Sequence, residues 1–186
     1  MKHILKPAFT LFAIAVIVTA SLSIGRRLTL EPIENQRRIA QEKTMKEALE
    51  EAAGFRELTG TEAKISGSIV RIFEGSKNGQ PAGYVIELAP SGYSGSISMM
   101  VGISSARNSI SGMRILRHTE TPGLGALAVK ENFFRRFDGK KLAPLKVTKL
   151  NPAENEIQAI TGATITSNAV TGAVNEAIEW YNRNRR

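Results

Sequence analysis

Three threonine hydroxyls near the C-terminus have the types and spacing of a site that could hold a phosphate group. Thr161, Thr164 and Thr166 lie with Gly162 and Ala163 just before a predicted helix. Small residues let a large group approach the backbone, and a helix N-terminus offers unpaired N–H groups and a positive dipole end. A threonine here could hold a phosphate as an ester or by hydrogen bonds. The same residues also fit a Ser/Thr-rich N-cap loop that binds no ligand.

The run Thr161-Gly-Ala-Thr164 resembles the flavinylation motif Asp-x-x-Ser/Thr-Gly-Ala-Thr of the FMN-binding family that includes RnfG/RsxG and NqrC. In that family a dedicated flavin transferase joins the phosphate of FMN to the last threonine of the motif as a phosphoester. The resemblance therefore implies covalent FMN on Thr164, with Thr166 as the second choice. It also implies that Thr161, Gly162 and Ala163 contact the cofactor.

Two further segments resemble the same family, and all three occur in the family's order. Residues 118–125, His118-Thr-Glu-Thr-Pro-Gly-Leu-Gly125, are similar to its Glu-Thr-Pro-Gly-Leu-Gly loop, and residues 92–95 are similar to its Gly-Tyr-Gly-Gly turn. The resemblance implies that the loop lines the flavin through Glu120, Thr121, Gly123, Leu124 and Gly125. His118 could donate to the flavin or tune its potential, and an ordinary surface histidine is the alternative.

Two positions depart from the family pattern. Gln158 stands where the motif has its leading aspartate, and Ser94 replaces the second glycine of the turn. If the transferase requires the carboxylate, the chain would stay unmodified, whereas an amide that still forms hydrogen bonds would suffice for recognition. Gln158 therefore favours one alternative function, a non-flavinylated membrane adapter of the same fold.

The resemblance covers nearly the whole chain and implies a membrane-anchored electron-transfer subunit that carries covalent FMN. The complex implied is an Rnf-type ion-translocating ferredoxin:NAD oxidoreductase, in which this subunit is a relay and not a catalyst by itself. Its implied partners are the other subunits of the complex and the flavin transferase. The second alternative is an NqrC-like subunit of a sodium-translocating NADH:quinone reductase.

The composition argues against several other chemistries. The 186 residues include no cysteine and two histidines, which excludes disulfides and cysteine-ligated iron–sulfur clusters and makes a multi-histidine metal site unexpected. The net charge of +8 comes from scattered cations without interleaved aromatics, so we expect no nucleic-acid partner. Solvated faces near an anionic membrane explain the charge better. A Ser/Thr hydrolase would have His118 as its one plausible base.

An uncharged apolar segment of membrane-spanning length lies near the N-terminus. Residues 7–25 contain no charged side chain. As a helix they extend roughly 28 Å, close to the thickness of a bilayer's hydrocarbon core. Basic residues flank both ends, so the positive-inside rule orients the segment only weakly. A cleaved secretory signal with its site at residues 18–20 is the alternative.

We expect three parts along the chain. Residues 1–27 form a transmembrane anchor, residues 28–60 a stalk helix or a flexible linker, and residues 61–186 an FMN-binding domain. The expected location is a bacterial inner or plasma membrane, crossed once, with the domain on the extracytoplasmic side. Pro32 suits a first helical turn of the stalk, and Gly54 suits its end.

The domain itself reads as an α+β fold with a mainly antiparallel sheet and packed helices. Apolar runs separated by Gly, Pro, Ser and Asn predict strands at residues 65–73, 83–88, 97–103, 110–116 and 145–150. Residues 125–137 predict a helix that buries its phenylalanines. A last helix begins near residue 167, and its apolar side chains recur at helical spacing. These are Val170, Val174, Ala177, Ile178 and Tyr181.

Overall fold

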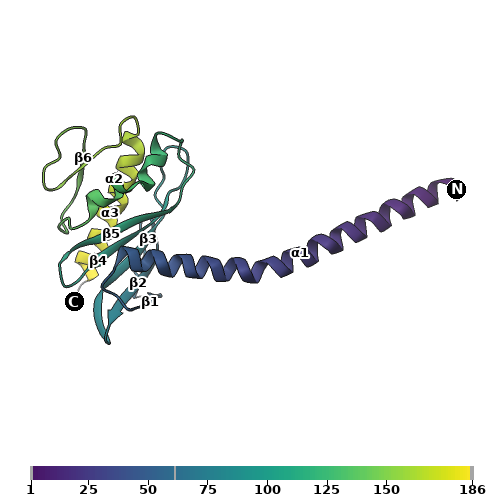
Figure 1. Cartoon of the computed structure of the whole chain (residues 1–186), viewed down its shortest axis with the longest axis horizontal. Helices are drawn as coiled ribbons and strands as arrows, with labels where there is room; N and C mark the ends of the chain where they lie inside the picture. The colour runs from purple at the N-terminus through teal and green to yellow at the C-terminus, as the bar shows by residue number, and fades with distance from the viewer. Residues whose placement is uncertain (1, 61, 185–186) are drawn as a thin grey trace. The chain divides into compact units, whose positions relative to one another are not determined.

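A computed structural model describes the backbone of residues 2–60 and 62–184, and the side chains of residues 9–21, 36, 38–60 and 62–184. The chain forms two compact units, Met1–Glu42 and Lys43–Arg186. The long helix α1, Lys2–Ala48, contributes residues to both units (Figure 1). It is helical before and after Pro32, and it ends at Ala48, whereas the sequence predicted a stop at Gly54.

Residues 2–42 of the first unit all belong to α1. Large apolar side chains at residues 9–18 are exposed, from Val16 at 50% to Phe9 at 73%. Over the side chains that the structure describes, no helix combines the length and the apolar character needed to cross a membrane. The predicted span falls partly outside these residues, since the side chains of residues 7, 8 and 22–25 are not among them.

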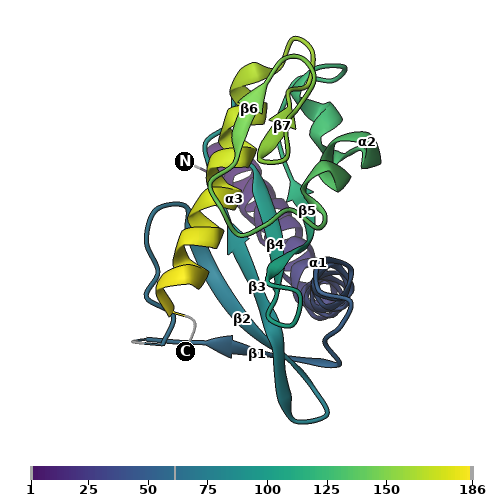
Figure 2. The same ribbon diagram turned by 90° about the vertical axis from the view of Figure 1, so that its left-hand side faces the viewer.

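Five antiparallel strands in sequence order form the main sheet of the second unit (Figure 2). Their bounds are β1 Gly54–Leu58, β2 Ile69–Lys77, β3 Gln80–Leu88, β4 Ser98–Ser104 and β5 Ser109–Arg117. The α+β class with an antiparallel sheet is thereby confirmed. The edge strand β1 was not predicted from the sequence, which placed these residues in the stalk. Residues 43–60 instead pack on the domain, with β1 paired to β2.

Helices cover both faces of this sheet, as Figure 2 shows for α3, Thr164–Asn184, and the end of α1. Alternate strand side chains point to opposite faces. One set, including Ile72, Ile86 and Val101, packs in the core that contains α3. The other set, Phe73, Val85 and Met100, packs in a smaller cluster with the end of α1 and the residues after it. The strands β2, β3 and β4 are therefore apolar on both faces.

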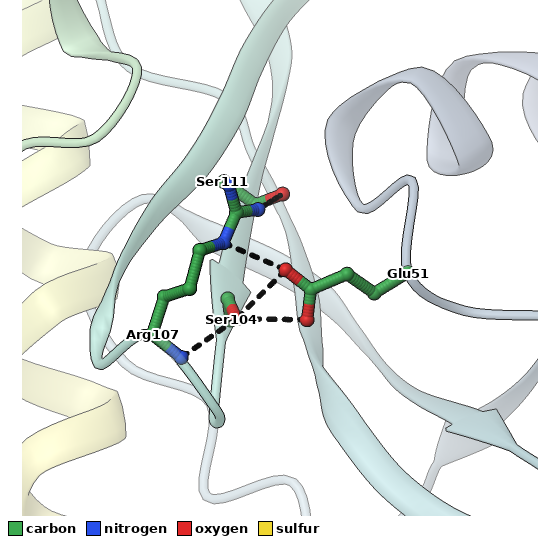
Figure 3. A network of polar contacts seen from close by, with 4 residues as sticks. All are labelled: Glu51, Ser104, Arg107 and Ser111. Atoms are coloured by element: carbon green, nitrogen blue, oxygen red, sulfur yellow. Dashed lines mark hydrogen bonds and ion pairs between the residues drawn. The ribbon is translucent and has the colours of Figure 1, made fainter.

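A polar network fixes the segment after α1 to the hairpin between β4 and β5 (Figure 3). Ser104 is fully buried, and its hydroxyl lies 2.9 and 3.0 Å from the two carboxylate oxygens of Glu51. The backbone N–H of Arg107 donates to this hydroxyl, and the Arg107 guanidinium bonds Glu51 at 2.7 Å and Ser111 at 3.0 Å. The buried hydroxyl is thus satisfied, as a buried polar group requires.

The segment between β5 and α3 contains short elements. These are the 3-10 helix η1 Gly125–Val129, the helix α2 Glu131–Phe134, the 3-10 helix η2 Arg135–Phe137, and the parallel strand pair β6 Lys146–Thr148 and β7 Glu156–Gln158. The single helix predicted over residues 125–137 is wrong in detail, because Lys130 is extended, with φ −84° and ψ 146°. The predicted burial of Phe133, Phe134 and Phe137 is confirmed.

Candidate functional site

Two loops that lie far apart in the sequence meet at the start of α3. Residues 118–125 follow β5, and residues 160–163 precede α3. A hydrogen bond from Thr166 Oγ1 to Glu120 Oε2, 2.5 Å long, joins them across 46 positions of sequence. Both residues are buried, with Thr166 1% and Glu120 5% exposed.

A cleft of about 370 Å³ lies between these loops. Eight of the ten residues for which the sequence predicted cofactor contact line it: Glu120, Thr121, Leu124, Gly125, Gly162, Ala163, Thr164 and Thr166. The other two, Thr161 and Gly123, lie outside the lining. The structure thus brings together the two segments that the motifs singled out.

Two further residues line the cleft, and neither was predicted from the sequence to contact a cofactor. Tyr93 belongs to the turn at residues 92–95, and its side chain is 70% exposed. The sequence could have predicted Tyr93, because the turn at residues 92–95 resembles a motif of the FMN-binding family. Ile165 follows Thr164 in the first turn of α3 and is 56% exposed. No motif in the sequence includes Ile165, so no pattern predicted its place in the cleft. Large apolar side chains at a cleft mouth are suited to contact a flat ring.

The threonines of the cleft differ in accessibility. Thr164 is the first residue of α3, and its side chain is exposed. Thr166 is buried, and its hydroxyl hydrogen is committed to Glu120. A group entering the cleft can therefore reach the Thr164 hydroxyl, whereas it would have to break the hydrogen bond to Glu120 to reach the Thr166 hydroxyl.

The sequence predicted that α3 starts near residue 167, but the helix starts three residues earlier, at Thr164. Ser167 lies inside the first turns, and its hydroxyl joins the helix to the turn that precedes it. Ser167 Oγ accepts from the Ile160 N–H at 3.0 Å and donates to the Ala163 carbonyl at 2.9 Å. Gly162 has a φ of +75°, a left-handed conformation that favours glycine. The first three residues of the 21-residue helix α3 line the cleft, so the positive end of the helix dipole lies at this site.

Glu120 is a buried carboxylate held by uncharged donors. Besides Thr166, the backbone N–H of Ser94 donates to its Oε1 at 2.9 Å. Burial by itself raises the pKa of Glu120, but hydrogen bonds from Thr166 and from the Ser94 and Tyr93 backbone favour the charged form. Together with the nearby His118, they outweigh the burial and bring the pKa below its ordinary value.

Two residues discussed from the sequence lie outside the cleft. His118 Nδ1 accepts a hydrogen bond from the Glu120 N–H at 3.2 Å, and its ring lines a separate hollow beside Arg117 and Val129. Gln158 ends β7, and its backbone carbonyl accepts from Arg136 at 2.5 Å. His118 is thus in contact with the cleft loop through the backbone of Glu120.

The fold and the cleft define an FMN-binding domain. The family model of the FMN-binding domain matches residues 92–179, which include every residue that lines the cleft, and the model of the RnfG N-terminal region matches residues 1–48. The G subunit of the ion-translocating oxidoreductase complex of Methanosarcina acetivorans is 35% identical over 96% of this chain and 95% of its own length. The chain belongs to the RnfG family.

Other similar proteins agree with this assignment. The G subunit of the Na⁺-translocating ferredoxin:NAD⁺ oxidoreductase complex of Acetobacterium woodii is 34% identical over 97% of this chain and 92% of its own length. Among solved structures, the C subunit of the Na⁺-translocating NADH-quinone reductase of Parabacteroides distasonis superposes with a TM-score of 0.61. It is 21% identical, and the match covers 78% of this chain and 90% of its own, so the likeness shows a shared fold.

Proposed function

We propose that this chain is the FMN-carrying electron-transfer subunit of an ion-translocating ferredoxin:NAD oxidoreductase complex. The observation that carries the proposal is the cleft itself. It is built by the loops that the FMN-binding model covers, in a chain similar along nearly its full length to G subunits of such complexes. In this role the chain relays electrons between neighbouring subunits.

The cleft fits FMN in size and in chemistry. Its volume of about 370 Å³ falls within the range of roughly 300–1,000 Å³ that small-molecule sites occupy. Tyr93, Leu124 and Ile165 expose apolar surface at the cleft, 70%, 43% and 56% respectively, which a flat ring would cover. The N-terminus of α3, in contrast to this apolar surface, offers polar backbone N–H groups that suit a phosphate.

Thr164 is our assignment for the covalent bond, a phosphoester between its Oγ1 and the phosphorus of FMN. Forming this ester removes one water overall, so the chain gains one FMN less a water. Exposure of Thr164 inside the cleft supports the assignment, and the buried hydrogen bond of Thr166 argues against the second choice. Thr161, outside the lining, is the least favoured of the three.

The redox chemistry is supplied by the isoalloxazine ring of bound FMN, which accepts and donates electrons. The residues of this chain have three tasks. Thr164 tethers the cofactor, the first turn of α3 neutralises the phosphate charge, and the apolar residues at the cleft exclude water from one side of the ring. The open side of the cleft leaves an approach for a neighbouring subunit.

We further propose that residues 7–25 anchor the chain in the membrane by a single span, with the FMN-binding domain on the extracytoplasmic side. The exposed apolar side chains at residues 9–18 support this, because a helix that is apolar on all sides needs an apolar environment. Thr19 and Ser21 donate to the carbonyls of Ala15 and Ile17, so their hydroxyls need no water.

The test is flavin fluorescence of the chain in an unstained denaturing gel, after expression with a flavin transferase. Fluorescence is expected to migrate with the wild-type chain, to vanish in Thr164→Ala and to persist in the control Thr59→Ala, which changes an exposed threonine outside the cleft and the motif. Intact mass should show one FMN less a water on the wild type. A chain that stays unmodified beside an active transferase would contradict the proposal and favour the adapter function that Gln158 suggests.

A further inference from the structure

We infer that Glu120 is a positioning residue whose carboxylate holds the three segments of the cleft in register, and so sets where Thr164 stands. This inference rests on the proposed function, since it concerns the same cleft. It assigns Glu120 no contact with the cofactor. Its contribution acts through Thr166 and through the turn that presents Tyr93.

The hydrogen bonds of Glu120 reach one partner in each neighbouring segment. Oε2 accepts from the Thr166 hydroxyl at 2.5 Å, in the first turn of α3, two residues after Thr164. Oε1 accepts from the Ser94 N–H at 2.9 Å, next to Tyr93. Thr119, which precedes Glu120 in the same loop, donates a further hydrogen bond from its hydroxyl to the Ser94 carbonyl at 3.1 Å. One carboxylate therefore bridges the loop at 118–125, the turn at 92–95 and α3.

Two glycines of the cleft motifs make room for this carboxylate. A Cβ atom on Gly92 would lie 2.5 Å from Glu120 Oε1, and one on Gly125 would lie 2.3 Å from Oε2 and 2.6 Å from Thr166 Oγ1. Neither glycine has a left-handed backbone. Space for the carboxylate, and not backbone conformation, is thus what these two positions require.

Charge explains why a carboxylate is suited to this position. In the described part of the chain, no lysine or arginine forms an ion pair with Glu120, whose partners are a hydroxyl and backbone N–H groups. A buried carboxylate has to keep such donors, because it is costly to bury without them. Any movement of α3 or of the turn away from Glu120 would strip a donor from the charge, so the charge resists that movement.

The experiment compares isosteric variants of the full-length chain, each expressed with and without a flavin transferase. Glu120→Gln keeps the volume but places an N–H₂ group towards one donor, and Thr166→Val removes only the hydroxyl. Thr166→Ser retains the hydroxyl and is the conservative partner of Thr166→Val. Glu131→Gln is the matched control, because the Glu131 carboxylate is 72% exposed and pairs with Arg135 one turn away.

Flavin loading is the first measurement, followed by intact mass over time. Glu120→Gln and Thr166→Val are each expected to load about tenfold more slowly, as loss of one charge-assisted hydrogen bond implies. The double variant should be no slower than either single one, because both remove the same bond. Thr166→Ser should recover most of the rate, and the visible circular dichroism of bound flavin should change in Thr166→Val but not in Glu131→Gln.

Hydrogen–deuterium exchange of the flavin-free chains is the second measurement and does not depend on the proposed function. Thr166→Val should speed exchange at its own helix start and also in the turn at residues 92–95, to which the Thr166 hydroxyl is linked through Glu120. The inference would be overturned if exchange changed only at the start of α3. It would also be overturned if Glu120→Gln and Thr166→Val both showed the loading rate and the circular dichroism of the wild type. If instead the wild type stays unloaded while the coupled exchange is seen, the proposed function fails and the positioning role stands.

Discussion

At the scale of single residues, the cleft shows how chemically similar side chains acquire different roles. Thr164 and Thr166 differ by two positions in one helical turn, yet one is exposed to the cleft and the other is 1% exposed and bonded to Glu120. A hydroxyl that already donates to a buried carboxylate is a poor acceptor of a new group, since the carboxylate would lose a donor. Accessibility and commitment, not residue type, separate the two.

Gly162 provides a prediction at this scale. Its φ is +75°, and an added Cβ would lie 2.9 Å from Leu124 Cδ2 in the cleft wall. Gly139 has a similar φ of +74° with nothing within 4 Å of such a Cβ. Both Gly→Ala variants should lose roughly 1–2 kcal/mol of unfolding free energy to the left-handed backbone. Gly162→Ala should lose more and should also load flavin more slowly.

The measurement is urea unfolding of the detergent-extracted chain, together with flavin loading by intact mass. Gly139→Ala serves as the control for backbone strain alone. If the two variants lose equal stability and load equally, Gly162 is required only for its conformation, and its contact with Leu124 has no role in shaping the cleft.

At the scale of elements, the domain depends on two helices that use opposite faces of one sheet. The α3 face closes the main core, and the end of α1 closes the smaller cluster. The second contact is close because β4 has Gly102 where the helix crosses, so a Cβ there would lie 2.0 Å from the Ala48 carbonyl oxygen. The polar network at Glu51 then fastens the chain immediately after this crossing (Figure 3).

Gly102→Ala should therefore displace the end of α1 and lower the free energy of unfolding by about 1–3 kcal/mol, the usual cost of overpacking. Gly172→Ala is the matched control of opposite sign. Gly172 is exposed on α3 with nothing within 4 Å of an added Cβ, so alanine should stabilise the helix by roughly 0.5–1 kcal/mol. Urea unfolding followed by the fluorescence of Trp180, the one tryptophan of the chain, measures both. Equal stability of Gly102→Ala and wild type would show that the helix end does not depend on this close approach.

At the scale of the whole molecule, the chain combines a basic domain with an uncharged N-terminal segment. The net charge of the whole chain, +8, would draw it towards an anionic lipid surface, but such attraction alone is weakened by salt. Salt would not weaken an attachment that buries the apolar side chains of residues 9–18 in hydrocarbon. The two modes of membrane association therefore differ in what reverses them.

We predict that the full-length chain stays with the membrane through washes in high salt and in alkaline carbonate, and that detergent releases it. A chain that lacks residues 1–27 should be released by salt. Intact mass distinguishes a retained anchor from a cleaved signal, which would leave a mature chain beginning after residue 20. Release of the full-length chain by carbonate would show that residues 7–25 do not span the bilayer.

Several features of this protein were determined by local sequence. Gly-, Ser- and Asn-rich turns between the short apolar runs of residues 69–117 favoured antiparallel pairing of those strands, because a link of a few residues joins antiparallel neighbours most readily. The helical spacing of Val170, Val174 and Ala177 predicted the buried face of α3, and their exposure of 0% each confirms it. The order of the three motifs identified which segments would line the cleft. Each of these depends on neighbours in the chain, which the sequence displays directly.

The tertiary structure decided the rest, because the deciding contacts join residues distant in sequence. The pairing of β1 with β2 and of β6 with β7 depends on partners 14–22 and 10 positions away, which no local pattern names. Whether the Thr166 hydroxyl is accessible in the cleft depends on Glu120, a residue 46 positions away in the sequence. A hydroxyl's chemistry is set by what surrounds it, and its surroundings here exist only once the chain has folded.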